Sequence, residues 1–364
     1  MSVFEIIYIP EITEKSIAGV AGDGAGYFVM LPENEKESIP VIQSFMPSSV
    51  NFAGAVFPAL IFNGKFVKSG VLLVKISNFR YFIQDFSSVN GRENQVATAV
   101  SRVKQLVVDD QSLLFMVFDG MIGDIGTIVD NMYLHLADQV KYGGVNAGSE
   151  TFQPMPVIFD RDRTLGMAML GMIIETSQGA ILEHGYKTPE EMVAATSTIG
   201  NRIEHINWKP AFDVYSDEIK RQYGVEIDTD NFYTYAVHFP VGIVKADGDV
   251  LVRIPVGIAG DGSIYCVGEI PPNSILTLIN APGYNKLDTA ERLRERIGGS
   301  SRTLIFYCAG RRMHLGQEAE SELEKIVQGG EGEFAGALSL GEIGSTFKGG
   351  YPSFHNATLV CVTE

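Results

Sequence analysis

A cysteine beside two arginines is the clearest candidate for nucleophilic chemistry in this chain. Cys308 ends an apolar run that begins at Leu304, and Arg311 and Arg312 follow it closely. Because nearby positive charge lowers the pKa of a thiol, this setting favours the reactive thiolate. A cysteine nucleophile also needs a base, for which His314 and His238 are the candidates. The alternative is that Cys308 is a small buried apolar residue at a strand end.

His238 is the one candidate metal ligand. It lies in the apolar segment from Tyr235 to Pro240, which we expect to be a strand that favours a neutral imidazole. A neutral imidazole with one free nitrogen can ligate haem iron. The alternative is a core histidine that is hydrogen-bonded to the backbone. The sequence has no C-x-x-C-H motif, which excludes covalent haem attachment.

Glu342 lies between small residues in a segment that we expect to be a strand. A buried carboxylate needs a cation or several N–H donors, and Arg253 and Arg311 are the candidate partners. Either arginine would form a structural ion pair with Glu342. Alternatively, the arginine and Glu342 would clamp the carboxylate and the ammonium of an amino-acid-like ligand.

The glycine-rich stretch 143–148 supplies two further ligand-binding candidates, Gly144 and Asn146. A glycine has no Cβ, so a ligand or another strand can approach its backbone closely. Packing between strands explains these glycines equally well.

Several classes of function are excluded by what the sequence lacks. It has no G-x-x-x-x-G-K-[ST], H-E-x-x-H or G-x-S-x-G motif and no EF-hand loop, so we expect no enzyme of those classes. Its net charge of −16 over 364 residues disfavours nucleic acids and anionic membranes. The longest uncharged apolar run, Leu165 to Ile174, is far shorter than the roughly 20 residues that cross a bilayer. No signal peptide is recognisable, so we expect a cytoplasmic protein.

One short sequence motif occurs three times, and it indicates the strands and helices that position the candidate residues. Each copy has an aromatic residue, a tiny residue, a glycine and a small apolar residue, and each lies between two apolar runs. The copies are Phe52 to Ala55, Tyr142 to Val145, and Phe334 to Ala337. The preceding runs are Tyr27 to Leu31, Leu113 to Phe118 and Leu304 to Cys308, and the following runs are Val71 to Ile76, Met167 to Ile174 and Thr358 to Val362. The recurrence predicts three related supersecondary units.

The pattern predicts a mixed α/β (α+β) fold with two domains, residues 1–212 and 213–364. Each domain combines a largely antiparallel or mixed sheet with packed helices, and the two are related by repeated β-α-β-hairpin units. Apolar residues at helical spacing predict helices over 94–108, 125–140 and 211–223. The segment 233–244 is expected to be a strand.

The order of several motifs resembles the FIST family. The N-terminal FIST domain is resembled by the stretch 143–148, by His184-Gly185-Tyr186 and by Gly200 to Ile203. The C-terminal FIST domain is resembled by His238-Phe-Pro240, Arg253, Phe306 to Arg311 and Gly341 to Gly344, followed by Phe354 to Thr358. The resemblance covers about residues 25–364.

The resemblance implies a sensory signal-transduction module that binds a small, amino-acid-like ligand between its domains and acts through a partner protein. His238, Arg253, Cys308, Arg311 and Glu342 are expected to converge at that site. Three alternatives stay open. The first is a haem-binding nitric oxide sensor that acts on a histidine kinase, with His238 as the axial ligand. The second is an enzyme that uses Cys308, and the third is an interaction scaffold that binds no ligand.

Overall fold

Three units of the same topology build most of the protein. The computed structural model describes residues 4–21, 26–88, 90–109, 112–176, 178–186, 192–245, 248, 250–278, 289–328, 332–346 and 349–364. In each unit two parallel strands are joined through a helix, and a third strand pairs antiparallel with the first. Unit 1 has β2 (Gly26–Pro32), β3 (Asn51–Phe57) and β6 (Val71–Ile76); unit 2 has β8 (Ser112–Asp119), β9 (Lys141–Ala147) and β12 (Ala168–Glu175); unit 3 has β22 (Arg302–Cys308), β23 (Glu333–Ser339) and β26 (Leu359–Thr363). The mixed α/β fold and its repeated units are therefore confirmed.

The repeated glycine has the same position in all three units. It lies in the second strand, and its backbone faces a carbonyl of the first strand so closely that a Cβ atom would clash with the carbonyl oxygen. The pairs are Gly54 with Val29, Gly144 with Met116, and Gly336 with Ile305, at 2.5, 2.3 and 1.8 Å from the built Cβ to the oxygen. The glycine is thus required by strand packing rather than by a ligand.

Further strands extend each unit into a six-stranded sheet, and three of them join distant parts of the chain. The sheet of unit 1 adds β1 (Phe4–Ile9), β10 (Ile158–Asp160) and β11 (Thr164–Leu165). The sheet of unit 2 adds β7 (Arg80–Asp85), β24 (Glu342–Gly344) and β25 (Ser353–His355), and that of unit 3 adds β4 (Leu60–Phe62), β5 (Lys65–Val67) and β13 (Ala180–Glu183). Because β4 pairs with β23, β13 with β26 and β24 with β9, the two ends of the chain form one body.

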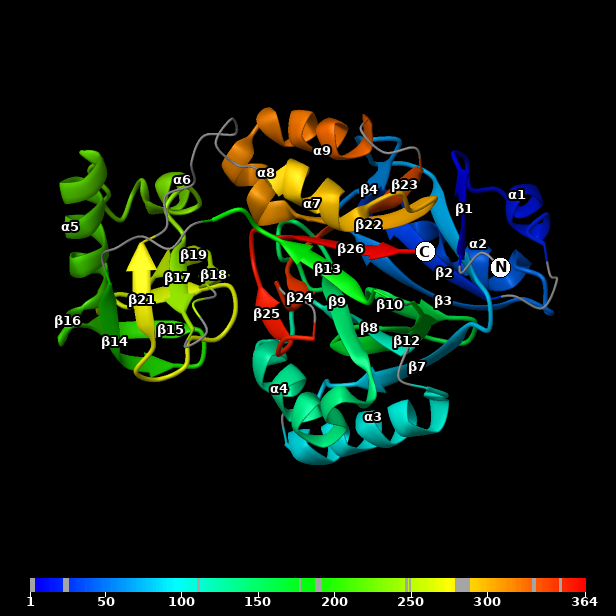
Figure 1. Cartoon of the computed structure of the whole chain (residues 1–364), viewed down its shortest axis with the longest axis horizontal. Coiled ribbons are helices and arrows are strands. Elements are labelled where there is room, and N and C mark those ends of the chain that lie inside the picture. The colour runs from blue at the N-terminus through cyan, green and yellow to red at the C-terminus, as the bar shows by residue number, and fades with distance from the viewer. Residues whose placement is uncertain are drawn as a thin grey trace.

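The three sheets face a common core, and helices cover their outer faces (Figure 1). In β8, for example, Phe115 faces the common core and Met116 faces the helices, as the alternation along a strand requires. Phe306 of unit 3 lies where the units meet, with ring centroids 6.1 Å from Phe57 of unit 1 and 5.3 Å from Phe115 of unit 2. The helices are α1 (Glu14–Ala18) and α2 (Ile39–Phe45) beside unit 1, α3 (Arg92–Leu106) and α4 (Ile125–Leu136) beside unit 2, and α7 (Thr289–Ile297), α8 (Ala309–Leu315) and α9 (Glu318–Gln328) beside unit 3.

The described residues between 192 and 278 form a separate small lobe at the left of Figure 1. Its sheet is antiparallel, and its own apolar cluster packs α5 (Ala211–Tyr223) and α6 (Phe232–Ala236) on the strands. The strands are β14 (Val193–Ile199), β15 (Arg202–Ile206), β16 (Lys209–Pro210), β17 (Val241–Val244), β18 (Val250–Arg253), β19 (Pro255–Ile258), β20 (Ile264–Cys266) and β21 (Ile275–Leu278). The chain enters this lobe after β13 and returns to the body at α7.

The expected strand over 233–244 is wrong for residues 233–240. Asp228 accepts hydrogen bonds from the backbone N–H groups of residues 230 and 231, and this turn leads into α6. Phe232 and Ala236 are buried, four residues apart on one helical face, whereas Tyr233 and Tyr235 are exposed. The strand β17 begins only at Val241.

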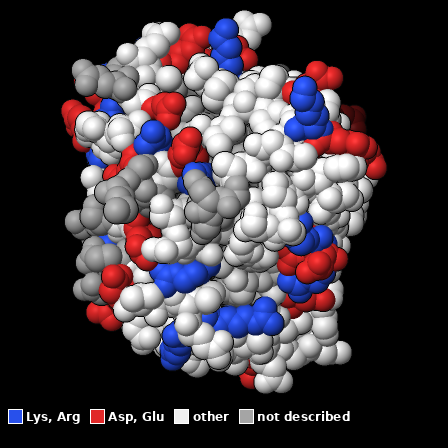
Figure 2. Space-filling model, turned by 90° about the vertical axis from the view of Figure 1, so that its right-hand side faces the viewer, with Lys and Arg blue, Asp and Glu red and all other residues white. Residues whose placement is uncertain are grey.

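The surface beside β1, α1 and α2 carries charges of both signs. On this face Lys and Arg side chains are interspersed with Asp and Glu (Figure 2). Among the described helices, none combines the length and the apolar character that crossing a membrane requires.

Candidate functional site

A cleft with two chambers lies between the body and the small lobe. The larger chamber has a volume of about 510 Å³ and the smaller one about 40 Å³. Four residues line both chambers: Phe152 of the body, and Tyr233, Val256 and Val267 of the small lobe. The chambers therefore form one continuous candidate site.

The carboxyl ends of the parallel strands in units 2 and 3 form the floor of the cleft. The loop after β8 is tied to the end of β9, because Gly120 N donates to Ala147 O at 2.9 Å. The end of β9 is tied to the residues after β23 by Leu340 N donating to Asn146 O at 2.9 Å. Open α/β sheets commonly bind ligands at this edge. Of the described residues, those of unit 1 do not line the cleft.

Asp119, the last residue of β8, fixes the loop that forms one wall. Its carboxylate accepts from Met121 N at 2.9 Å and from Met167 N at 2.6 Å. Burial raises the pKa of this carboxyl, and the two backbone donors act against that rise. Both carboxylate oxygens of Asp119 therefore accept hydrogen bonds from the protein itself.

Asn146 lies near the end of β9 and lines the larger chamber. The side chain is buried, at 2% exposure, and among the described residues its Oδ1 has no hydrogen-bond partner. Gly144, two residues earlier, does not line the cleft, because its close approach is to Met116. Of the two candidates predicted in this stretch, Asn146 therefore lines the cleft and Gly144 does not.

Cys308 ends β22 and lines the smaller chamber. Burial raises the pKa of its thiol, and the Glu342 carboxyl raises it further. The sequence-based expectation of a lowered pKa is therefore wrong. The main reason is burial of the thiol; in addition, the two expected sources of positive charge are paired with other residues, Arg311 with Glu322 and Arg312 with Glu150.

Glu342 begins β24 and lies behind Cys308, with 0% exposure. Its carboxyl accepts from Ser339 Oγ at 2.6 Å and from Thr358 N at 3.4 Å, and the Cys308 thiol also donates to it. Burial raises the pKa of this carboxyl well above its usual range. Among the described residues it forms no ion pair, so the predicted pairing with Arg253 or Arg311 is wrong.

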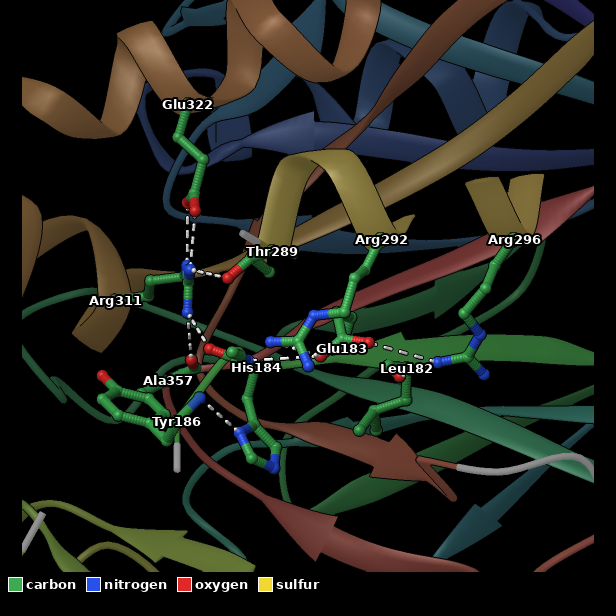
Figure 3. Close-up of polar contacts among 11 residues, drawn as sticks. Leu182, Glu183, His184, Tyr186, Thr289, Arg292, Arg296, Arg311, Glu322 and Ala357 are labelled. Atoms are coloured by element: carbon green, nitrogen blue, oxygen red, sulfur yellow. Dashed lines mark hydrogen bonds and ion pairs between the residues drawn. The ribbon is translucent and has the colours of Figure 1, made fainter. Parts of the chain in front are cut away.

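Arg311 lies on α8 and forms a closed cluster of polar contacts (Figure 3), and it does not line either chamber. Its guanidinium contacts both oxygens of Glu322, at 2.8 and 2.6 Å. The remaining N–H groups donate to His184 O at 2.7 Å, to Ala357 O at 3.1 Å and to Thr289 Oγ1 at 3.0 Å. Every N–H of the guanidinium then has an acceptor, so none is left for a ligand.

Arg253, at the end of β18, bridges the small lobe and the body beside the larger chamber. It donates to Glu269 O and to Phe354 O, both at 2.9 Å, and its guanidinium lies 5.5 Å from the Phe354 ring centroid. Burial lowers the pKa of Arg253 to about 10. This residue supports the wall that Phe354 forms, but it does not itself line either chamber.

His238 lies outside the cleft, in the turn between α6 and β17, and it is exposed rather than buried. Its ring centroid lies 5.2 Å from that of His314, whose Nδ1 lies 2.8 Å from Val237 O. Burial lowers the pKa of His314 to about 4. His238 therefore does not have the apolar surroundings that the sequence predicted.

The residues around His238 do not fit a haem. The chamber nearest to it, which Val237 lines, has about 40 Å³, against the roughly 300 Å³ or more of ordinary ligand pockets. The described lining of the larger chamber contains no histidine. The geometry gives no support to a haem alternative with His238 as the axial ligand.

Several residues that line the cleft were not predicted as site residues from the sequence. Asn356, noted there only within a motif, lines the smaller chamber, and its Oδ1 is buried without a partner among the described residues. Tyr233 and Val256 come from the small lobe, whose position the sequence does not reveal. The available signal was the end of each parallel strand, which points to Asn146 but not to the opposite wall.

The comparison with protein-family models agrees with this architecture. A model of the FIST N domain matches residues 27–209, and a model of the FIST C domain matches residues 211–345. A search of curated proteins gives no match. Because the two models together cover most of the chain, including both walls of the cleft, this protein belongs to the FIST family.

Proposed function

We propose that this protein is a sensory module that binds a small ligand in the cleft between its lobes and passes the signal to a partner protein. FIST domains are sensor domains of signal transduction. The observation that supports the proposal most directly is the larger chamber, whose volume of about 510 Å³ lies within the usual range for ligand pockets. The unpartnered Asn146 Oδ1 in its wall offers a polar anchor.

The contacts that join the lobes supply a route from ligand to output. Glu269 of the small lobe caps the N-terminus of α4 in the body, because its carboxylate accepts from Thr127 N at 2.9 Å and from Thr127 Oγ1 at 2.5 Å. An anion at a helix N-terminus is stabilised by the helix dipole. Ile254 packs so closely on Gly310 of α8 that a Cβ there would lie 2.2 Å from its Cδ1. A ligand between these contacts changes their relative stability and therefore the position of the small lobe.

The output goes to a separate signalling protein such as a histidine kinase. This part of the proposal rests on the family alone. An amino-acid-like ligand held between an arginine and Glu342 is not favoured, because Arg311 is fully hydrogen-bonded elsewhere and Glu342 lies behind Cys308. An enzyme that uses Cys308 is not favoured either, because burial keeps the thiol protonated.

Native mass spectrometry of the freshly purified chain tests the ligand-binding part. Val256 lines both chambers, so Val256→Phe fills the cleft, whereas Ile199→Phe is a control in the same lobe at a position that is 65% exposed. We expect a small bound mass on the natural chain and on Ile199→Phe, and its loss from Val256→Phe. A bound mass that survives in Val256→Phe, or none on the natural chain, contradicts the proposal.

A further inference from the structure

The walls of the larger chamber carry no formal charge. Among the described residues that line it there is no Asp, Glu, Lys, Arg or His. Cys266 lines it as well, and burial raises the pKa of that thiol to about 12, so it stays neutral. A charged ligand would therefore leave water without meeting an opposite charge.

The charged groups just behind these walls are engaged by the protein. Arg253 donates to the carbonyls of Glu269 and Phe354, and the Asp119 carboxylate accepts from two backbone N–H groups. The Glu269 carboxylate caps α4. Of the described residues that line the smaller chamber, one is charged: Glu150, which is paired with Arg312. These contacts would have to break before any of the groups could neutralise a ligand.

Exposed apolar side chains collect around the cleft. Met121 is 37% exposed, Phe152 38% and Tyr233 54%, and all three line the larger chamber; Met313, 40% exposed, lines the smaller one. Large apolar side chains left open to water and gathered around one cleft indicate a surface that a partner molecule covers. Their arrangement in a concave site favours a ligand with an apolar ring.

Two buried acceptors lack donors at the same place. Asn146 lines the larger chamber and Asn356 the smaller one, and the Oδ1 of each has no partner among the described residues. Each residue is no more than 2% exposed. The Asn356 amide nitrogen donates to His355 O at 3.2 Å, which leaves the oxygen as the unsatisfied atom. A buried acceptor without a donor is unfavourable, and a ligand N–H or O–H removes that penalty.

We infer that the larger chamber selects an uncharged small molecule with an apolar ring and an N–H or O–H donor that binds Asn146 Oδ1, and that it rejects carboxylates, phosphates and ammonium compounds. The inference rests on the proposed ligand-binding function and specifies its ligand class. It replaces the zwitterionic amino acid expected from the sequence with a neutral donor.

Four probes of nearly the same shape separate the two parts of the inference. Benzamide is neutral and has N–H donors, acetophenone is neutral without donors, benzoate is an anion and benzamidine is a cation. Each is titrated at millimolar concentration into the full chain labelled with ¹³C at the methionine methyl groups. The Met121 methyl reports the larger chamber, and Met192, which is 51% exposed in the small lobe and does not line the cleft, is the control.

We expect benzamide to shift the Met121 signal and to bind at least tenfold more tightly than benzoate or benzamidine. Loss of one hydrogen bond to a buried acceptor corresponds to about a tenfold difference, so acetophenone should bind about tenfold more weakly than benzamide. Asn146→Leu removes the preference for benzamide over acetophenone. Asn131→Leu, an amide on α4 outside the cleft, keeps it. If Asn146→Leu does not fold, the relative affinities of the four probes for the natural chain still test whether the chamber prefers a neutral ligand with a donor.

Different failures overturn different statements. Benzoate or benzamidine binding as tightly as benzamide, with the same Met121 shift, overturns the ligand class and leaves the cleft as the site. If acetophenone binds as tightly as benzamide, Asn146 does not act as the acceptor for the ligand. If no probe shifts Met121, or if the shifts persist in Val256→Phe, the cleft is not the binding site and the proposed function falls as well.

Discussion

Two buried carboxyl groups contact neighbouring residues of β22 and behave in opposite ways. Tyr307 donates to Glu322 at 2.7 Å on the helical side of the sheet, and Cys308 donates to Glu342 beside the cleft. Burial alone would raise the pKa of both carboxyls. Arg311 lowers that of Glu322 below its usual range. Glu342 forms no ion pair among the described residues, and burial outweighs the opposing effect of Arg311, so its pKa is raised.

The comparison separates a structural cluster from a binding wall. Around Glu322 each donor has an acceptor and no group is available to a ligand, so this cluster fixes α8 and α9 on unit 3. Among the described residues, the polar groups that line the larger chamber are neutral, and Asn146 Oδ1 has no donor. A strongly shifted pKa or a buried charge is therefore not by itself the mark of the site.

The largest expected effect comes from removing the cation of the closed cluster. Arg311→Met leaves Glu322 buried without its partner and should lower the free energy of unfolding by about 3–5 kcal/mol. Urea denaturation measures this. The matched control is Arg312→Met on the same helix, whose pair with Glu150 is 23% and 25% exposed and should contribute under about 1 kcal/mol. Equal losses in the two variants would mean that burial does not distinguish the pairs.

A smaller change in the free energy of unfolding, of opposite sign, is expected when Glu342 is replaced by Gln. Its folded pKa lies above the unfolded value of 4.5, so its contribution to stability is complete below pH 4.5 and is lost as the pH rises through the folded pKa. Glu342→Gln keeps an acceptor for Ser339 and removes that loss, so it should be more stable than the natural chain by about 1–2 kcal/mol at pH 8.

Glu322→Gln provides the matching variant for the pH series. Because the folded pKa of Glu322 is lowered, its contribution is present above pH 4.5 and is lost as the pH falls through the folded pKa. This variant should therefore be less stable than the natural chain at pH 8. Urea denaturation at pH 5, 6.5 and 8 measures both variants, and the comparison fails if they change stability in the same direction.

The smallest effect of a substitution is expected on the reactivity of Cys308. Burial and the neighbouring Glu342 keep the thiol protonated, so iodoacetamide at pH 7.5 should alkylate Cys308 at least 100-fold more slowly than a free cysteine, on the order expected for an inert buried thiol. Glu342→Gln should change this rate only slightly, because burial is the larger cause. Peptide mass spectrometry of the alkylated protein gives the rate, and rapid labelling of Cys308 in the folded chain would revive the enzymatic alternative.

The repeated units could be predicted because close packing between two strands requires a glycine at the same position of each unit. At Gly54, Gly144 and Gly336 any side chain would meet a carbonyl of the neighbouring strand, so the glycine and the apolar runs around it recur together. Continuous apolar runs also predicted the strands that follow the glycine. Local patterns of this kind depend only on near neighbours in the chain.

The partners of charged residues could not be predicted in the same way. Arg311 pairs with Glu322 because α8 turns it toward α9, and the sequence does not show that turn. Tyr233 reaches the cleft only because the Asp228 turn starts a helix where the apolar pattern suggested a strand. The site depends on how the small lobe sits against the body, which is a long-range property.

The pairing of late strands with early ones also has a consequence for biosynthesis. β4 and β9 are translated long before their partners β23 and β24, and the whole small lobe and most of unit 3 are translated between β13 and its partner β26. A nascent chain on the ribosome therefore presents unpaired strand edges until residues 333–363 emerge, and such edges promote aggregation. We expect its folding yield to depend on chaperones that shield those edges during translation.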